Sequence, residues 1–263
     1  MQVSQTTIAQ VPTCIRRGGS GFPLLFLHGW GSSSAAWETI GDFFISSGYD
    51  VIIPDLPGFG DSAPPPAAWG TAEYADWVHE LLGSLGIQTC CLVGHSFGGR
   101  LTIKYTAGHA DRICGIVLVA AAGIKPADLN ARIKKVTFQQ AAKVGKGLFR
   151  LPIMRLFAAP ARKILYRAAR EHDYEKAEGI MKEVLARVVQ EDLQAELGQI
   201  AVPALLLWGA QDSLTPLADG ERMQALLTHS RLQVFPKAGH ALYKQFSDEV
   251  CREINSFISP LAR

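Results

Sequence analysis

The sequence lacks the features that would place it outside the ordinary globular proteins. Charged residues make up only 19% of its 263 residues, and the net charge at pH 7 is +2. A charge this close to zero provides no electrostatic footprint for nucleic acid, so we expect no nucleic-acid partner. Low-complexity tracts are missing and 48% of the residues are hydrophobic. This composition predicts a packed core and excludes a disordered chain.

Cysteine is scarce, and its spacing excludes the two structures that cysteines most often build. The five cysteines are odd in number and none are in C-x-x-C spacing: Cys14, Cys90, Cys91, Cys114 and Cys251. We therefore expect neither a disulfide framework nor a zinc site.

Long hydrophobic runs are also missing. The longest apolar stretch covers residues 113–124, whereas a membrane-spanning helix needs about 18 residues or more. Residues 1–19 have no basic start followed by the apolar segment of a secretory signal. The expectation is a cytoplasmic protein without a membrane span.

What the chain does contain is a regular alternation of short apolar segments with longer amphipathic ones. Strands are predicted at 23–29, 49–56, 90–95, 115–121, 204–209 and 232–236, and helices at 35–47, 72–85, 97–109, 216–228 and 242–258. Most of the strand segments are apolar throughout, as expected for strands covered on both faces. Thr215 and Pro216 suit an N-cap and a first helical position. This order predicts an α/β fold with a mostly parallel open sheet and helices on both faces.

One stretch interrupts the alternation. Residues 124–200 are helical in composition, and we interpret them as a helical cap inserted into a core made of residues 1–123 and 201–263. Residues 125–170 carry twelve lysines or arginines against one acidic residue. This charge is interpreted as the solvated faces of amphipathic helices, with a basic rim that attracts anionic substrates as the alternative.

The segment LVGHSFGG, residues 92–99, places a serine between two glycines where a predicted strand meets a predicted helix. This setting is that of a nucleophile elbow, a sharp turn with a strained backbone. Gly94 and Gly98 remove side chains that would collide in such a turn. Ser96 is therefore the candidate nucleophile, at the carboxyl end of the sheet where ligands bind in open α/β folds.

A serine hydroxyl needs a base to take its proton and a third group to orient that base. His240 directly follows the last predicted strand, and Asp212 follows the strand before it. Both then fall at the same edge of a parallel sheet as Ser96, in the chain order expected for this elbow. Because the alternative acid position after the fourth strand offers no carboxylate, we predict a triad of Ser96, Asp212 and His240.

The neighbouring polar residues receive other interpretations. His28 and His95 adjoin glycines at strand ends and are candidates to line the site, although His95 precedes Ser96 on a strand and is expected to point to the opposite face. Asp55 and Asp61 are expected to organise the glycine-rich loop in which they lie.

The segment LHGWGSSS, residues 27–34, has glycines on both sides of Trp30 at the end of a predicted strand. We expect the turn to aim the Trp30 amide at the serine, where it and the Phe97 amide would form a two-donor oxyanion hole and so bind substrate. The third glycine of a dinucleotide-binding G-x-G-x-x-G is replaced by Ser34, which argues against a nucleotide site.

The motifs HGWG, DLPGFGDS, GHSFGG, LLLWGAQD and AGH resemble those of the α/β-hydrolase family, in that family's order and over nearly the whole chain. Within the family the chain resembles small capped serine hydrolases, among them carboxylesterases of the pimeloyl-ester esterase type. The resemblance implies Ser96 as nucleophile, Asp212 as acid, His240 as base and the amides of Trp30 and Phe97 as oxyanion hole. Because a serine occupies the nucleophile position, branches that attack with aspartate are disfavoured.

The expected function is hydrolysis of carboxylic esters with small to medium apolar acyl chains, through an acyl-enzyme and with no metal or cofactor. An apolar pocket is expected from Trp30, Phe97 and Leu242, with Phe138, Phe149, Met154 and Phe157 as contributors from the cap. The same triad also serves carbon–carbon bond hydrolases and aminopeptidases, and a binding or signalling protein on this fold is a further alternative. The sequence indicates neither the natural substrate nor the oligomeric state.

Overall fold

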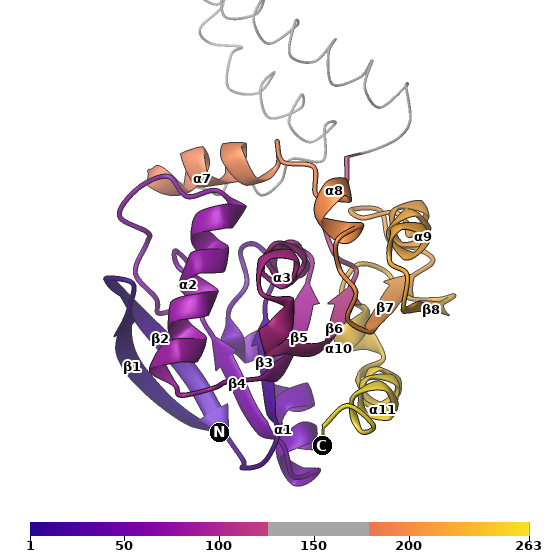
Figure 1. Cartoon of the computed structure of the whole chain (residues 1–263), viewed down its shortest axis with the longest axis horizontal. Helices are drawn as coiled ribbons and strands as arrows, with labels where there is room; N and C mark the ends of the chain where they lie inside the picture. Colours follow the sequence, from indigo (N-terminus) through magenta and orange to yellow (C-terminus); the bar gives the residue numbers. More distant parts are fainter. Residues whose placement is uncertain (126–178, 263) are drawn as a thin grey trace, which may run out of the picture. The chain divides into compact units, whose positions relative to one another are not determined.

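A single sheet organises the part of the chain that the computed structural model describes, residues 1–125 and 179–262. Within these residues eight strands form the order β1-β2-β4-β3-β5-β6-β7-β8 (Figure 1). Their bounds are β1 (Gln2–Ile8), β2 (Val11–Gly18), β3 (Pro23–Leu27), β4 (Asp50–Pro54), β5 (Cys90–His95), β6 (Ile113–Val119), β7 (Ala204–Gly209) and β8 (Ser230–Phe235). The pairs from β4 to β8 are all parallel, which confirms the mostly parallel sheet predicted from the sequence.

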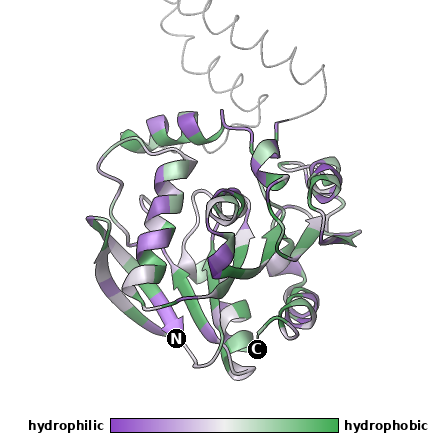
Figure 2. Ribbon diagram, viewed as in Figure 1, coloured by the Kyte–Doolittle hydropathy of each residue, from purple (hydrophilic) through white to green (hydrophobic). Residues whose placement is uncertain are grey.

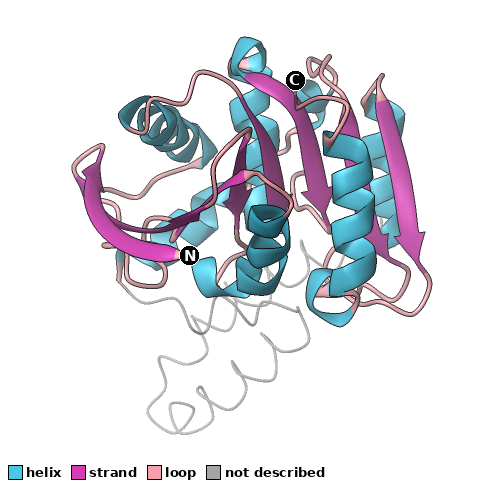
Figure 3. Ribbon diagram, turned by 90° about the horizontal axis from the view of Figure 1, so that it is seen from below, coloured by secondary structure: helices cyan, strands magenta, loops and turns pink. Residues whose placement is uncertain are grey.

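Helices cover both faces of the sheet, so its central strands are enclosed. The helices are α1 (Glu38–Ser46), α2 (Thr71–Ser84), α3 (Phe97–Gly108), α7 (Ile180–Val188), α8 (Gln194–Leu197), α9 (Leu217–Leu226), α10 (Leu242–Gln245) and α11 (Ser247–Ile258), with 3₁₀ turns η1 (Ser34–Trp37) and η2 (Ala110–Arg112). Helices α1 and α11 pack together on one face, while α2 and α3 pack together on the other (Figures 1 and 3). Every residue of β4, β5 and β7 is buried. Figure 2 shows hydrophobic residues concentrated in these strands, which explains why they lack alternation.

The first two strands are a hairpin that the sequence analysis did not predict. Strand β1 pairs with β2 antiparallel, and β2 pairs antiparallel with β4. The hairpin turns at Ala9 and Gln10, which both have positive φ, of 46° and 65°. Two consecutive positive φ angles suit the right-handed twist of the strands, and asparagine and glycine are the usual residues there. Strand β1 is exposed along nearly its whole length, so it shows no apolar pattern.

The predicted helix 242–258 is two helices. Helix α10 ends at Gln245, and Phe246 adopts φ −132° and ψ 46° before α11 begins. The first turn of α11 contains Asp248 and Glu249, whose negative charges are favourable at a helix N-terminus. Val250 and Ile254 are fully buried, as expected for the apolar side of an amphipathic helix.

The stretch predicted as a cap is described only in part. Residues 126–178, which include Phe138, Phe149, Met154 and Phe157, lie outside the described residues, so the cap stays a prediction. Residues from Gly179 onward belong to the same compact unit as Met1–Ile124. Glu191 ties this segment to the core, because its carboxylate accepts hydrogen bonds from the Thr71 amide and hydroxyl at the start of α2. Its carbonyl also accepts one from Arg100.

Among residues 1–125 and 179–262, no helix is both long enough and apolar enough to cross a bilayer.

Candidate active site

Ser96 lies in a strained turn between β5 and α3. Its backbone has φ 51° and ψ −110°, in a region that residues with a side chain rarely adopt. The turn is held from β6 and its end, because the Ser96 amide donates to the Val119 carbonyl at 3.1 Å and the Ala122 amide donates to the Ser96 carbonyl at 2.9 Å. The side chain of Ser96 is attached where the chain reverses, at the carboxyl edge of the sheet.

The glycines around Ser96 allow three chain segments to meet. A Cβ atom added to Gly94 would lie 2.5 Å from the Gly98 carbonyl oxygen, and one added to Gly98 would lie 2.2 Å from the Leu27 carbonyl oxygen. Such distances exclude any side chain. The expectation that Gly94 and Gly98 remove colliding side chains is therefore confirmed.

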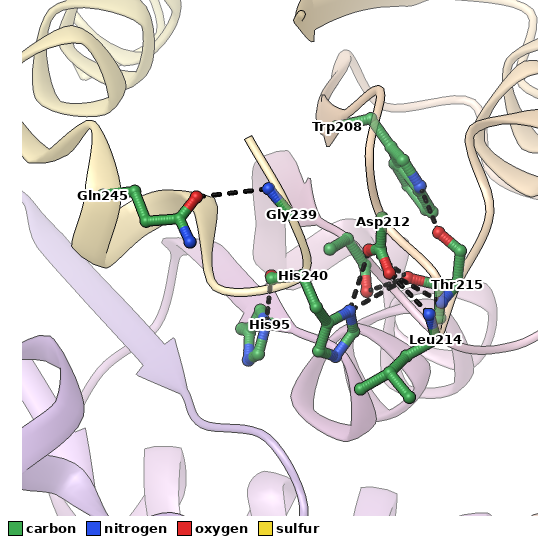
Figure 4. A network of polar contacts seen from close by, with 9 residues as sticks. His95, Trp208, Asp212, Leu214, Thr215, Gly239, His240 and Gln245 are labelled. Carbon is green, nitrogen blue, oxygen red and sulfur yellow. Dashed lines mark hydrogen bonds and ion pairs between the residues drawn. The ribbon is translucent and has the colours of Figure 1, made fainter. Parts of the chain in front are cut away.

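Asp212 and His240 come from different loops and form a direct hydrogen bond (Figure 4). The distance from His240 Nδ1 to Asp212 Oδ2 is 2.8 Å. The Asp212 side chain is fully buried, whereas 18% of the His240 side chain is exposed. Asp212 follows β7 and His240 follows β8, as predicted, and these neighbouring parallel strands bring both loops to one edge.

The carboxylate of Asp212 is saturated with donors. Its Oδ1 accepts the amides of Leu214 at 2.8 Å and Thr215 at 3.0 Å, and its Oδ2 accepts the Thr215 hydroxyl at 2.8 Å beside the His240 ring. Burial by itself raises the pKa of Asp212, but the hydrogen bonds from His240 and Thr215 and the charge of His240 outweigh burial and lower it. Asp212 is therefore an ionised carboxylate at neutral pH.

Thr215 has a different role from the one predicted. The N-cap of α9 is Pro216 and the helix begins at Leu217. The Thr215 hydroxyl instead contacts Asp212 and lies 3.1 Å from the Ala120 carbonyl oxygen. A buried carboxylate needs these donors more than a partly exposed helix end needs a cap. The D-S-L-T spacing, in which Asp212 binds amides two and three residues ahead, is the sequence signal of this turn.

The two loops approach closely because of Gly209. A Cβ atom at this position would lie 2.3 Å from the Ala238 carbonyl oxygen, which also accepts the Gln211 amide at 2.9 Å. The Trp208 indole donates to the Thr215 carbonyl at 2.8 Å. Both loops are thus bound to the end of β7, and their separation is set by main-chain contacts.

Ser96 and His240 are not joined by a hydrogen bond in the described part of the chain. Of the three predicted triad residues, the structure brings Asp212 and His240 into contact and places Ser96 at the same edge. The residue before Ser96 does contact His240, since the centroid of the His95 ring lies 4.8 Å from that of His240. As the alternation of the strand predicts, His95 shares a face of β5 with Cys91 and Val93, where its ring contacts Trp37 and Tyr243. From that face the ring also reaches the His240 carbonyl.

The loop that carries Trp30 packs against the serine turn. A Cβ atom on Gly29 would lie 3.4 Å from the Ser96 Cβ. Phe97 begins α3. Within the described residues, neither the Trp30 amide nor the Phe97 amide donates a hydrogen bond. Both amides belong to segments next to the serine and have no acceptor among the described residues, as an oxyanion hole requires.

Aromatic rings surround this corner of the site. The centroid of the Trp30 ring lies 5.3 Å from that of Phe97 and 4.8 Å from that of Phe59. Trp30 is half-buried, whereas Leu242 is fully buried among core residues and therefore does not line an open pocket.

His28 and Asp55 hold the two neighbouring loops in place. The His28 Nε2 accepts the Leu56 amide at 3.0 Å, so its Nδ1 carries the proton and donates to the Gly29 carbonyl at 2.8 Å. Burial lowers the pKa of His28 to about 4, which keeps the ring neutral. The carboxylate of Asp55 accepts the amides of Ser34 and Asp61. Asp55 and the Asp61 main chain thus organise the glycine-rich loop, as predicted.

One cluster of the described residues has the composition of a metal site: Cys14, Asp55 and Asp61. The carboxylate in this cluster stabilises the loop instead, because both oxygens of Asp55 accept hydrogen bonds from main-chain amides. Burial, followed by the nearby charge of Asp55, raises the pKa of the Cys14 thiol. The raised pKa disfavours the thiolate, which is the form of cysteine that binds metals.

Known proteins resemble this chain over most of its length. A family model described as alpha/beta hydrolase fold matches residues 23–246. The pimeloyl-[acyl-carrier protein] methyl ester esterase of Aliivibrio salmonicida (strain LFI1238) is 29% identical over 257 residues, covering 92% of this chain and 94% of the relative. A non-heme haloperoxidase of Rhodococcus erythropolis is 27% identical, covering 91% and 93%. A solved structure of a thermophilic esterase from Thermogutta terrifontis has a TM-score of 0.74 at 20% identity, covering 100% of both chains, and this likeness shows the fold.

The close contact at Gly98 predicts a large and local effect of one methyl group. Gly98→Ala should lower the free energy of unfolding by about 2–3 kcal/mol, because the new Cβ meets the Leu27 carbonyl. Gly108→Ala, in the same helix, is the matched control: its Cβ would meet nothing within 4 Å, and we expect no loss of stability. Urea unfolding measures both variants, and equal midpoints would contradict the packing described.

The lowered pKa of Asp212 predicts how stability depends on pH. Because the folded state holds the pKa below the ordinary value of 3.8, ionised Asp212 favours folding; its contribution is complete above about pH 5 and is lost as the pH falls through the folded pKa. The stability difference between wild type and Asp212→Asn should therefore be largest near neutral pH and shrink in acid. Asp76→Asn, an exposed carboxylate on α2, should cost little at any pH. A difference that grows in acid would refute the assignment.

Proposed function

Because the chain belongs to the alpha/beta hydrolase fold family, we propose that it is a serine hydrolase that cleaves carboxylic esters. The observation that carries this proposal is the buried hydrogen bond between Asp212 and His240, at the same edge of the sheet as the strained Ser96. A buried carboxylate bound to a partly exposed imidazole is the arrangement that prepares a general base.

The first step is proton transfer from Ser96 to His240. Asp212 holds the proton of His240 on Nδ1, which leaves the Nε2 lone pair as the base. When Nε2 takes the serine proton, the positive imidazolium stays paired with the ionised carboxylate. In enzymes without substrate the hydrogen bond from serine to histidine is often long and tightens in the substrate complex.

The amides of Trp30 and Phe97 stabilise the negative charge that develops on the substrate oxygen. No acceptor among the described residues occupies them, so both are free to donate to the substrate. The Phe97 amide also lies at the N-terminus of α3, where the helix dipole favours an anion.

The reaction then passes through an acyl-enzyme. Ser96 Oγ bonds to the carbonyl carbon, and the alcohol leaves with the proton from His240. Water, deprotonated by His240, attacks the acyl group, and Ser96 recovers its proton as the acid departs. These steps require only the side chains of Ser96, His240 and Asp212 and the two amides.

The substrate class follows from the residues around the serine. Trp30, Phe97 and Phe59 are packed against one another beside Ser96, and Leu214, next to Asp212, is 57% exposed. Apolar groups in these places favour a small to medium apolar acyl chain over a charged one. The esterase relative, named for a methyl ester substrate, supports an ester.

Removal of the nucleophile tests the mechanism directly. Ser96→Ala should lower kcat for p-nitrophenyl butyrate by about 10³-fold or more, as in other serine triads. The control is Ser84→Ala, at the exposed end of α2, with unchanged kcat expected. A fluorophosphonate should label the wild type at Ser96 and leave Ser96→Ala unlabelled, as read by peptide mass spectrometry. Near wild-type turnover by Ser96→Ala would refute the assignment of the nucleophile.

A panel of p-nitrophenyl esters of increasing chain length tests the substrate class. Each buried methylene is worth about 0.8 kcal/mol, so kcat/KM should rise about fourfold per carbon until the apolar surface is filled. Succinate monoesters, thioesters and amino-acid anilides should be cleaved more slowly than esters of matched length. The background rate is given by Ser96→Ala. Faster cleavage of the anionic ester would favour the basic rim, and faster cleavage of the anilide would indicate an aminopeptidase.

A further inference from the structure

We infer that His95 is a positioning residue for His240, and this inference rests on the proposed function. Its imidazole lies between the loop that carries His240 and the loop that carries Trp30, and it holds the main chain of His240 through a hydrogen bond. No motif in the sequence assigns this role, since the residue was interpreted only as a strand residue pointing to the opposite face from Ser96.

The first contact is with the main chain of His240. His95 Nε2 lies 3.1 Å from the His240 carbonyl oxygen, and the two ring centroids are 4.8 Å apart with an interplanar angle of 52°. Asp212 binds the same histidine through its ring nitrogen. His240 is therefore held at two points, the ring by Asp212 and the backbone by His95 (Figure 4).

The second contact is with the loop of Trp30. A Cβ atom on Gly29 would lie 2.8 Å from His95 Nδ1, so the ring occupies the space where a side chain would be. The same Cβ would lie 3.4 Å from the Ser96 Cβ. Nε2 of the His95 ring thus binds the main chain of His240, and Nδ1 lies against the loop that carries Trp30.

The protonation of His95 follows from these contacts. Burial, and next the positive charge on His240, lower the pKa of His95 to about 3, so the ring is neutral at neutral pH. A neutral ring has one proton, and the acceptor beside it is the His240 carbonyl, which places the proton on Nε2. Within the described residues Nδ1 is buried and has no hydrogen-bond partner. His95 therefore adds no second charge beside the imidazolium that forms in catalysis.

Aromatic side chains hold the ring in this orientation. The Tyr243 ring lies 4.7 Å from that of His95, and the Trp37 ring lies 6.4 Å away, edge to face. The ring centroids of Tyr243 and Trp37 lie 4.4 Å from each other. The ring cannot turn its donor away from His240 without displacing these neighbours.

A matched pair of amides tests the hydrogen bond. Glutamine carries its side-chain nitrogen at about the distance of a histidine Nε2, whereas asparagine is one bond shorter and does not reach the carbonyl of His240. We expect His95→Gln to retain kcat to within about fivefold, and His95→Asn and His95→Leu to lose about 10- to 100-fold with KM nearly unchanged. Thermal unfolding midpoints within about 4 °C of wild type show that the fold is intact. If His95→Leu does not fold, the comparison of Gln with Asn decides.

A double-mutant cycle separates positioning from general packing. In a His240→Ala background, His95→Asn should change the residual rate by less than about twofold, because its effect acts through His240. Equal kcat for His95→Gln and His95→Asn would overturn the inference. So would a 10- to 100-fold loss of the residual rate when His95→Asn is made in the His240→Ala background.

A spectroscopic measurement is independent of activity. Imidazole nitrogen shifts in the wild type should show His95 protonated on Nε2 and bare on Nδ1 from pH 5 to 9. A proton on Nδ1, or a doubly protonated ring, would overturn the inference.

Failure of the proposed function has a different signature, in which wild type and Ser96→Ala cleave esters equally. Wild-type activity that depends on Ser96 but not on His95 would overturn the positioning role alone.

Discussion

The arrangement of the site depends on one buried hydrogen bond, between Asp212 and His240. A buried carboxylate is costly unless each of its oxygens is bound, and here four donors reach it: two amides, the Thr215 hydroxyl and the His240 ring. These donors meet only because β7 and β8 are parallel neighbours whose loops emerge at one edge. Gly209 then allows the loops to approach closely. The sheet is therefore what makes this buried charge stable.

Ser96 depends on a second constraint, a backbone held in an unfavourable conformation. Such a residue costs about 1–3 kcal/mol and persists only where its surroundings determine it. The contacts are main-chain hydrogen bonds to Val119 and Ala122 and the approach of the Leu27 carbonyl to Gly98. All of them come from neighbouring strands or their ends, so the strain is supported by the most buried part of the molecule. The two constraints meet at one edge of the sheet.

The sequence predicted the elements that a pattern of neighbouring residues is enough to identify. Strands buried on both faces appear as apolar runs, so β3 to β7 were found. The edge strand β8 is only partly buried, but it was also found. Asp212 and His240 were placed correctly after β7 and β8. The hairpin β1-β2 was missed because an exposed edge strand has no apolar pattern and its turn is Ala-Gln. Thr215 was misread, and the contact of His95 with His240 was missed, for another reason. Each bonds to a group whose position is set by tertiary contacts, a carboxylate in one case and a distant carbonyl in the other.

The environment, rather than the residue type, distinguishes the three histidines at this edge. His28 and His95 are buried without a carboxylate at hydrogen-bond distance, and their pKa values fall to about 4 and about 3, so neither ring takes up a proton at neutral pH. Both are instead fixed in one tautomer by main-chain groups. His240 alone has a buried anion on one nitrogen and partial exposure on its side chain. Of the three imidazoles, it is therefore the one whose cationic form the protein can stabilise, which is the property that a general base requires.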